Sequence, residues 1–71
     1  MKKHSVMIAG HATSISLEDA FWEELKACAQ RNNMPVSTLV AQIDAQRTEP
    51  LSSALRIYLL NDAKKSQKYK A

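Results

Sequence analysis

The amino-acid sequence predicts a small, mainly α-helical domain with one short β region at its N-terminal end. Apolar and polar residues alternate up to residue 17, which is typical of strands, and from residue 18 apolar residues recur every three or four positions, which is typical of helices. The chain has 71 residues and a single cysteine. It cannot form an internal disulfide, and so small a core supplies only about 3–5 kcal/mol. We therefore expect it to associate with a second copy.

Two extended segments, about 4–8 and 12–17, are predicted on either side of Gly10. Apolar residues occupy even positions before Gly10 and odd positions after it, so the chain must change face between the segments. Gly10 is the only glycine and can form a turn or bulge there. The strand at 12–17 needs a partner for its backbone groups, either residues 4–8 or the same strand of a second chain. The second solution also enlarges the core, and we favour it.

Three helices are predicted, over residues 18–31, 35–47 and 52–63. Asn33 suits a left-handed C-cap of the first helix, Pro35 suits the first turn of the second, and Pro50 interrupts the chain before the third. The third helix is apolar on more than one side, which requires burial against a partner. The expected shared core of a dimer comprises Ile15, Leu17, Phe21, Leu25, Leu39, Val40, Ile43, Leu55, Tyr58 and Leu59.

Basic residues gather at both ends of the chain. Residues 1–63 form one expected domain, and residues 64–71 form a basic, flexible tail with four lysines. Lys2 and Lys3 lie at the N-terminal end, whereas residues 5–63 hold four basic and seven acidic side chains. Basic ends are typical of proteins that bind nucleic acid or anionic membranes, although a solubilising tail has the same composition. No apolar run is long enough for a signal peptide or a spanning helix. We expect a cytoplasmic protein without membrane contact.

No catalytic motif and no metal-ligand spacing occurs in the sequence. The histidines and the cysteine stand at positions 4, 11 and 28, which is not the spacing of a zinc site. Phe21, Trp22 and Cys28 share or adjoin one helical face, and we expect all three to be core residues. The sequence predicts a protein that is not an enzyme and that needs neither metal nor cofactor.

Residues 13–26, TSISLEDAFWEELK, resemble the strand-to-helix junction of the ribbon-helix-helix DNA-binding proteins, the class that includes Arc, MetJ and CopG. More narrowly, the chain is similar to small bacterial members with a G-H-x-T-S-[IV]-S-L-E-x-x-F-W signature. That resemblance rests on Gly10, His11, Thr13, Ser14, Ile15, Ser16, Leu17, Glu18, Phe21 and Trp22, and on LSSALR at 51–56.

The resemblance implies an intertwined homodimer with a third, C-terminal helix in each chain. An antiparallel two-stranded ribbon, one strand from each chain, then enters the DNA major groove. By alternation, the ribbon's DNA-facing residues are Ala12, Ser14 and Ser16. Expected phosphate contacts are Lys2, Lys3, His4 and, at the start of the second helix, Val36, Ser37 and Thr38.

The predicted function is that of a bacterial transcriptional regulator, a repressor, that binds double-stranded DNA as a homodimer or a higher oligomer. Two alternatives stay open. In the first, the chain is an antitoxin whose apolar third helix and basic tail bind a toxin. In the second, it is a dimeric protein-interaction module whose ribbon serves only for association.

Overall fold

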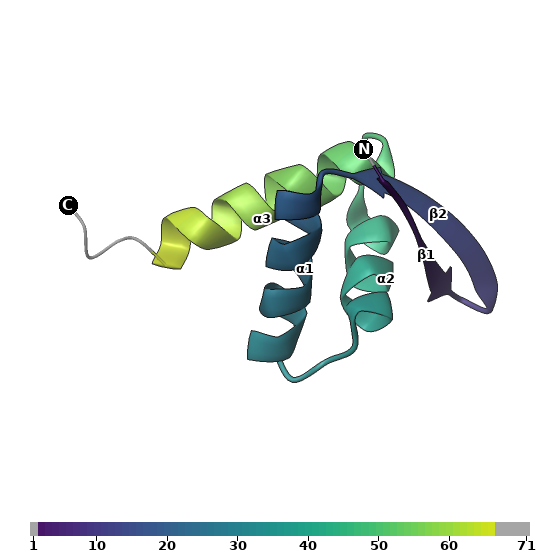
Figure 1. Cartoon of the computed structure of the whole chain (residues 1–71), viewed down its shortest axis with the longest axis horizontal. Helices are drawn as coiled ribbons and strands as arrows, with labels where there is room; N and C mark the ends of the chain where they lie inside the picture. Colours follow the sequence, from purple (N-terminus) through teal and green to yellow (C-terminus); the bar gives the residue numbers. More distant parts are fainter. Residues whose placement is uncertain (1, 67–71) are drawn as a thin grey trace.

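The structure is a computed structural model that describes residues 2–66. Two strands come first, β1 (Lys2–Ile8) and β2 (His11–Leu17), and three helices follow: α1 (Asp19–Arg31), α2 (Val36–Gln46) and α3 (Leu51–Ser66). Figure 1 shows α1 and α2 side by side, α3 lying across them, and the two strands projecting beyond α2. The predicted fold class, a β region at the N-terminal end followed by three helices, is confirmed.

The two strands form an antiparallel hairpin within one chain. Pairing runs over the whole length of both strands, from Lys2 opposite Leu17 to Ile8 opposite His11. The turn consists of Ala9 and Gly10, both with positive φ, 52° and 82°, as two-residue hairpin turns of type I′ require. Of the two partners considered for residues 12–17, the segment in the same chain is therefore the one found. The second edge of β2 has no neighbouring strand within residues 2–66, so a ribbon shared between two chains stays a prediction.

The third helix is longer than the sequence indicated. Residues 64–66, expected in the flexible tail, continue α3, and the lysines at 64 and 65 stand in its last turn. Positive side chains are favourable there because the C-terminal end of a helix carries partial negative charge. The rest of the expected tail, residues 67–71, lies outside the described residues.

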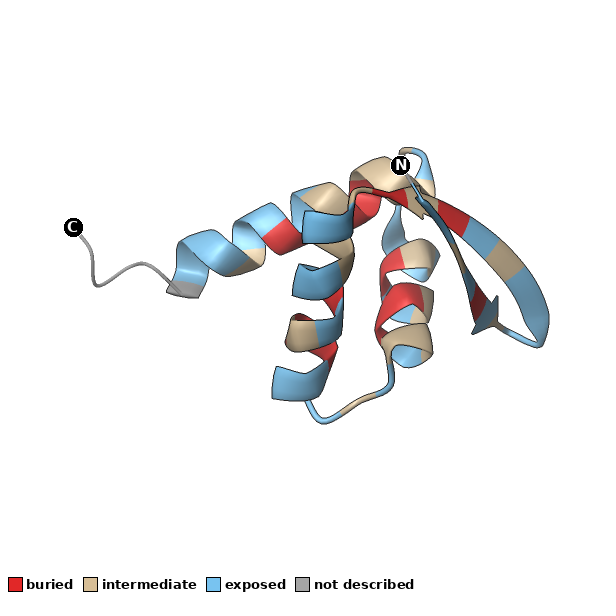
Figure 2. Ribbon diagram, in the orientation of Figure 1, coloured by how far each residue is buried: buried red, intermediate tan, exposed pale blue. Residues whose placement is uncertain are grey.

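The hydrophobic core is closed within the single chain, and Figure 2 shows its buried residues on the facing sides of the ribbon and the helices. Most of the residues expected to be shared by two chains are buried here, whereas Phe21 is half-buried and Tyr58 exposed. Cys28 is fully buried, as expected, and burial raises the pKa of its thiol. The buried residues are Val6, Ile15, Leu17, Leu25, Cys28, Ala29, Leu39, Val40, Ile43, Ala54, Leu55 and Leu59.

Two ion pairs fix α3 along α1. Near the start of α1, Arg56 donates from both Nε and Nη2 to Oε1 of Glu18, each at 2.9 Å. At the end of α1, Arg31 Nη2 donates to Asp62 Oδ2 at 2.8 Å. The chain then turns at Asn33, which takes the expected left-handed conformation with φ 55°. These contacts orient the helical body on which the ribbon is mounted.

Candidate nucleic-acid interface

The ribbon has a helix-facing side and an outer face. Val6 of β1 and Ile15 of β2 are buried on the helix-facing side. The residues next to each of them along its strand point the other way, because side chains alternate along a strand. The register places Lys3 opposite Ser16, Ser5 opposite Ser14, and Met7 opposite Ala12. We call these six residues the outer face. All are exposed except Ser16, which is half-buried.

The predicted DNA-facing residues Ala12, Ser14 and Ser16 therefore lie together on the outer face, but they form only half of it. Sequence reasoning missed Ser5 and Met7 and assigned Lys3 to phosphate contacts alone. The alternation of residues 4–8 predicts an extended segment correctly. Its outward-facing residues were not assigned to DNA because the partner of residues 12–17 was expected from a second chain.

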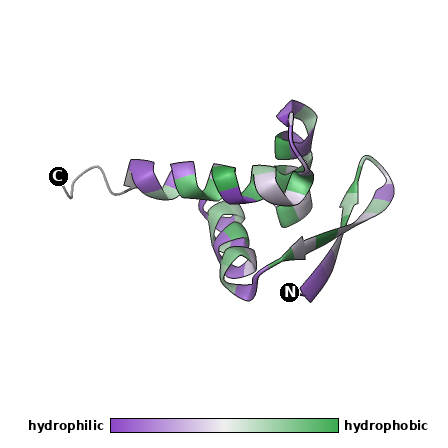
Figure 3. Ribbon diagram, turned by 90° about the horizontal axis from the view of Figure 1, so that it is seen from above, coloured by the Kyte–Doolittle hydropathy of each residue, from purple (hydrophilic) through white to green (hydrophobic). Residues whose placement is uncertain are grey.

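The ribbon carries basic residues but no acidic ones. Residues 2–17 contain two lysines and no acidic residue, whereas the remainder of the sequence holds all seven acidic side chains together with eight basic ones. Lys2 and Lys3 are exposed at the end of the ribbon next to α1. Figure 3 shows the ribbon at one side of the helices, with a hydrophilic segment at the start of β1. The outer face can therefore approach a polyanion without bringing a carboxylate with it.

His4 does not accompany Lys2 and Lys3. Its ring stacks on that of Trp22, with the centroids 4.0 Å apart and an angle of 7° between the planes. Nε2 of His4 is buried and has no hydrogen-bond partner within the described part of the chain. The residue thus lies on the helix-facing side, opposite Ile15, and we do not include it among the phosphate contacts proposed below.

The first turn of α2 presents backbone donors, as the sequence indicated. The N–H groups of Val36 and Ser37 have no acceptor within residues 2–66, and Pro35 before them supplies no side-chain cap. The N–H of Thr38 is already used, because it donates to the carbonyl oxygen of Pro35 at 3.1 Å. The two amides expected to bind a phosphate, those of Val36 and Ser37, are therefore available at the positive end of the α2 dipole, where anions bind favourably; the contribution expected from Thr38 is its hydroxyl.

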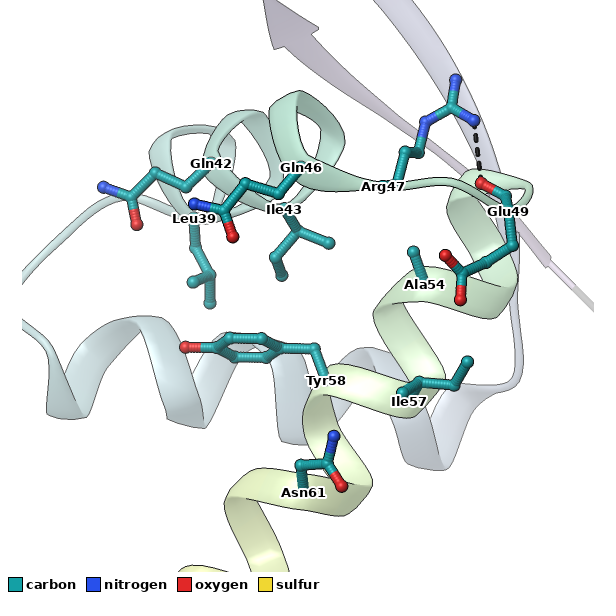
Figure 4. A pocket seen from close by; sticks show the side chains of 10 residues that line it. All are labelled: Leu39, Gln42, Ile43, Gln46, Arg47, Glu49, Ala54, Ile57, Tyr58 and Asn61. Atoms are coloured by element: carbon teal, nitrogen blue, oxygen red, sulfur yellow. Dashed lines mark hydrogen bonds between the residues drawn. The ribbon is translucent and has the colours of Figure 1, made fainter.

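Among residues 2–66, the large exposed apolar side chains other than Met7 all lie on helix α3. Ile57 and Leu60 are 47% and 55% exposed. A hollow of about 320 Å³ lies between α2 and α3, and Figure 4 shows Tyr58 reaching across it towards Leu39 and Ile43. Tyr58 is 36% exposed, and the partial burial of its ring raises the pKa of its hydroxyl. Within residues 2–66 no group of three or more histidine, cysteine or acidic side chains could hold a metal ion.

Comparison with known proteins gave one match. A family model described as a ribbon-helix-helix domain matches residues 1–63. Neither the curated proteins nor the solved structures gave a match. None of the helices within residues 2–66 is both long and apolar enough to cross a bilayer.

Proposed function

Because the chain belongs to the ribbon-helix-helix family, we propose that it is a sequence-specific transcriptional regulator, a repressor, whose β-ribbon enters the major groove of double-stranded DNA. The family match confirms the resemblance to the ribbon-helix-helix class, whereas the narrower bacterial signature stays a prediction. Such domains are in general DNA-binding regulators or antitoxins and typically not enzymes. The observation that carries the proposal is the acid-free ribbon that projects beyond the helices. Two antiparallel strands fit the width of the major groove.

The phosphate contacts proposed for this interface come from two places. At one end of the ribbon, Lys2 and Lys3 are exposed and can pair with backbone phosphates. On the helical body, the amides of Val36 and Ser37 can receive a phosphate, with the hydroxyls of Ser37 and Thr38 beside them. Contacts of this kind fix the register of the protein on DNA but carry no sequence information.

The proposed regulator is a homodimer, with higher oligomers on DNA. The exposed side chains of Ile57 and Leu60 on α3 support self-association, and a contact there leaves the two-stranded ribbon unchanged. Exposed apolar side chains are features that a partner chain typically covers. A repressor acts where the chromosome lies, so the proposal places the protein in the bacterial cytoplasm.

A salt titration tests the proposal. Affinity for a labelled duplex, measured by fluorescence anisotropy, should fall with a log–log slope of about −0.9 per phosphate neutralised. Lys3→Ala should reduce that slope by about one. Lys26→Ala is the matched control, because Lys26 lies on α1 and pairs with Glu23 at 3.1 Å, and it should leave the slope unchanged. Absence of duplex binding at low salt would overturn the proposal and favour a ribbon that serves only for association.

The exposed apolar residues of α3 support a second candidate, an antitoxin that binds its toxin through this helix. Phe21, Ile57 and Leu60 line an open groove between α1 and α3. An antitoxin requires a toxin gene, typically beside its own. Co-purification with the product of an adjacent reading frame, lost in Leu60→Ser and retained in Met7→Ser, would favour this candidate.

A further inference from the structure

We propose that β1 supplies half of the DNA-reading face and that Met7, at its tip, recognises the methyl group of a thymine. This inference rests on the proposed function, and it adds a specificity-determining residue to it. The pairing of the two strands within one chain places Lys3, Ser5 and Met7 on the same face as Ser16, Ser14 and Ala12.

Met7 is a large apolar residue that the fold leaves exposed to solvent. Its side chain is 57% exposed, and every other large exposed apolar side chain among residues 2–66 lies on α3. Its neighbours in β1, Val6 and Ile8, point to the helix-facing side. Across the ribbon stands Ala12, whose methyl group is too small to cover it. Met7 is thus the one long apolar side chain of the outer face, and it lies at the projecting end of the ribbon.

The major groove offers one apolar group to such a side chain, the C5-methyl of thymine. Methionine is unbranched and adapts its shape to the surface that it contacts, and the methyl of Ala12 extends the same apolar spot. The central pair, Ser5 and Ser14, discriminates poorly because a hydroxyl can donate or accept. Sequence preference on the outer face is therefore concentrated at the tip, where a thymine is favoured.

The test begins with duplexes selected by the wild-type protein from a random-sequence library. Each thymine of a selected duplex is then replaced in turn by uracil, which removes only the C5-methyl. At the thymine under the tip we expect affinity to fall about fourfold, the effect of leaving one methyl group unburied. Met7→Ser should bind the thymine duplex about fourfold more weakly and show no further loss with uracil, whereas Met7→Leu should keep the uracil effect.

Ile57→Ser is the matched control, because Ile57 is also an exposed apolar residue but lies on α3, and it should keep the uracil effect. If a selected duplex is bound but no thymine is sensitive, or if Met7→Ser keeps the full sensitivity, the inference is wrong while the proposed function stands. If Met7→Ser instead lowers the mass measured by light scattering and keeps the uracil effect, Met7 contacts a second copy and the inference is again wrong. If no duplex is enriched, the proposed function itself fails.

Discussion

At the scale of single residues, Glu18 joins the end of the ribbon to the helices. Its Oε1 accepts two hydrogen bonds from the Arg56 guanidinium, which also lies over the ring of Phe21 at 5.8 Å from the centroid. A hydrogen bond from its own backbone N–H, followed by the bond from Arg56, lowers the pKa of the Glu18 carboxyl below its ordinary 4.5. The ionised form is therefore the one that the fold favours.

Glu18→Gln should make the protein less sensitive to acid. A carboxyl whose pKa is lowered by folding contributes stability above its unfolded-state pKa, and that contribution is lost as the pH falls through the folded value. The urea midpoint of the wild type, followed by circular dichroism, should thus fall more between about pH 5 and pH 3 than that of Glu18→Gln. Glu23→Gln, which alters a more exposed carboxylate paired with Lys26, should retain the acid sensitivity. Equal sensitivity in Glu18→Gln and the wild type would contradict the prediction.

Some single-residue placements follow from local pattern and others do not. Alternation alone puts Ser14 outside and Ile15 inside, because a strand has only two faces. His4 obeys the same alternation, but its stacking on Trp22 depends on where the first turn of α1 lies relative to β1. The sequence analysis assigned His4 to phosphate contacts, and only the tertiary structure reveals its aromatic partner, Trp22.

At the scale of elements, the hairpin explains the change of phase around Gly10. In the observed register an even residue of β1 always faces an odd residue of β2, as Val6 faces Thr13. Residues directly opposite each other share a face of the sheet, so an antiparallel hairpin with a two-residue turn requires the apolar set to move from even to odd positions. The phase change predicted a discontinuity correctly. The same phase change is consistent with pairing within one chain, although the sequence analysis favoured a strand in a second chain because that strand satisfies the same backbone groups.

The turn offers a stability test of the hairpin. Ala9 has φ 52° and Gly10 φ 82°, and a Cβ added to Gly10 would meet no atom within 4 Å. Gly10→Ala should therefore destabilise the protein by about 1 kcal/mol through backbone conformation alone. Ala9→Asn should stabilise it by about 0.5–1 kcal/mol, because Asn-Gly is a preferred type I′ pair.

Urea unfolding at neutral pH measures both changes. Ala12→Asn is the control, since residue 12 is an exposed alanine in extended backbone, and it should bring no such gain. If Gly10→Ala leaves the free energy of unfolding unchanged, the turn does not constrain the hairpin in solution.

Helix α3 marks what an apolar pattern can and cannot predict. The excess of apolar residues correctly indicated burial on more than one side, and Leu55 and Leu59 are buried. The pattern does not say which chain covers them, since the transfer of apolar surface from water is non-directional. Here α1 and α2 of the same chain do so, and Ile57 and Leu60 remain for a partner.

At the scale of the whole molecule, size and exposed surface both favour association. One chain of 7.9 kDa buries a smaller fraction of its surface than a larger domain does, and its stability margin is correspondingly narrow. The single chain nevertheless closes its own core, so a partner would cover the exposed apolar side chains of α3 rather than complete that core.

If the protein is a homodimer, its stability should depend on concentration. Light scattering should give about twice the 7.9 kDa of one chain, and the urea midpoint should rise as protein concentration is increased, because association favours the folded state by mass action. Leu60→Ser should weaken this dependence, and Lys26→Ala, which alters an exposed residue paired within α1, should preserve it. A single-chain mass together with a midpoint independent of concentration would exclude the dimer.

The absence of carboxylates from the ribbon also affects how the molecule approaches a polyanion. The lysines at the ribbon have no acidic residue in the same two strands, whereas the rest of the chain holds all seven acidic side chains together with basic ones, as in the pairs of Glu23 with Lys26 and Asp44 with Arg47. At physiological ionic strength the field of a polyanion decays over about 8 Å, so its attraction for the ribbon acts across the last few layers of water. This attraction affects the rate of association more than the rate of dissociation.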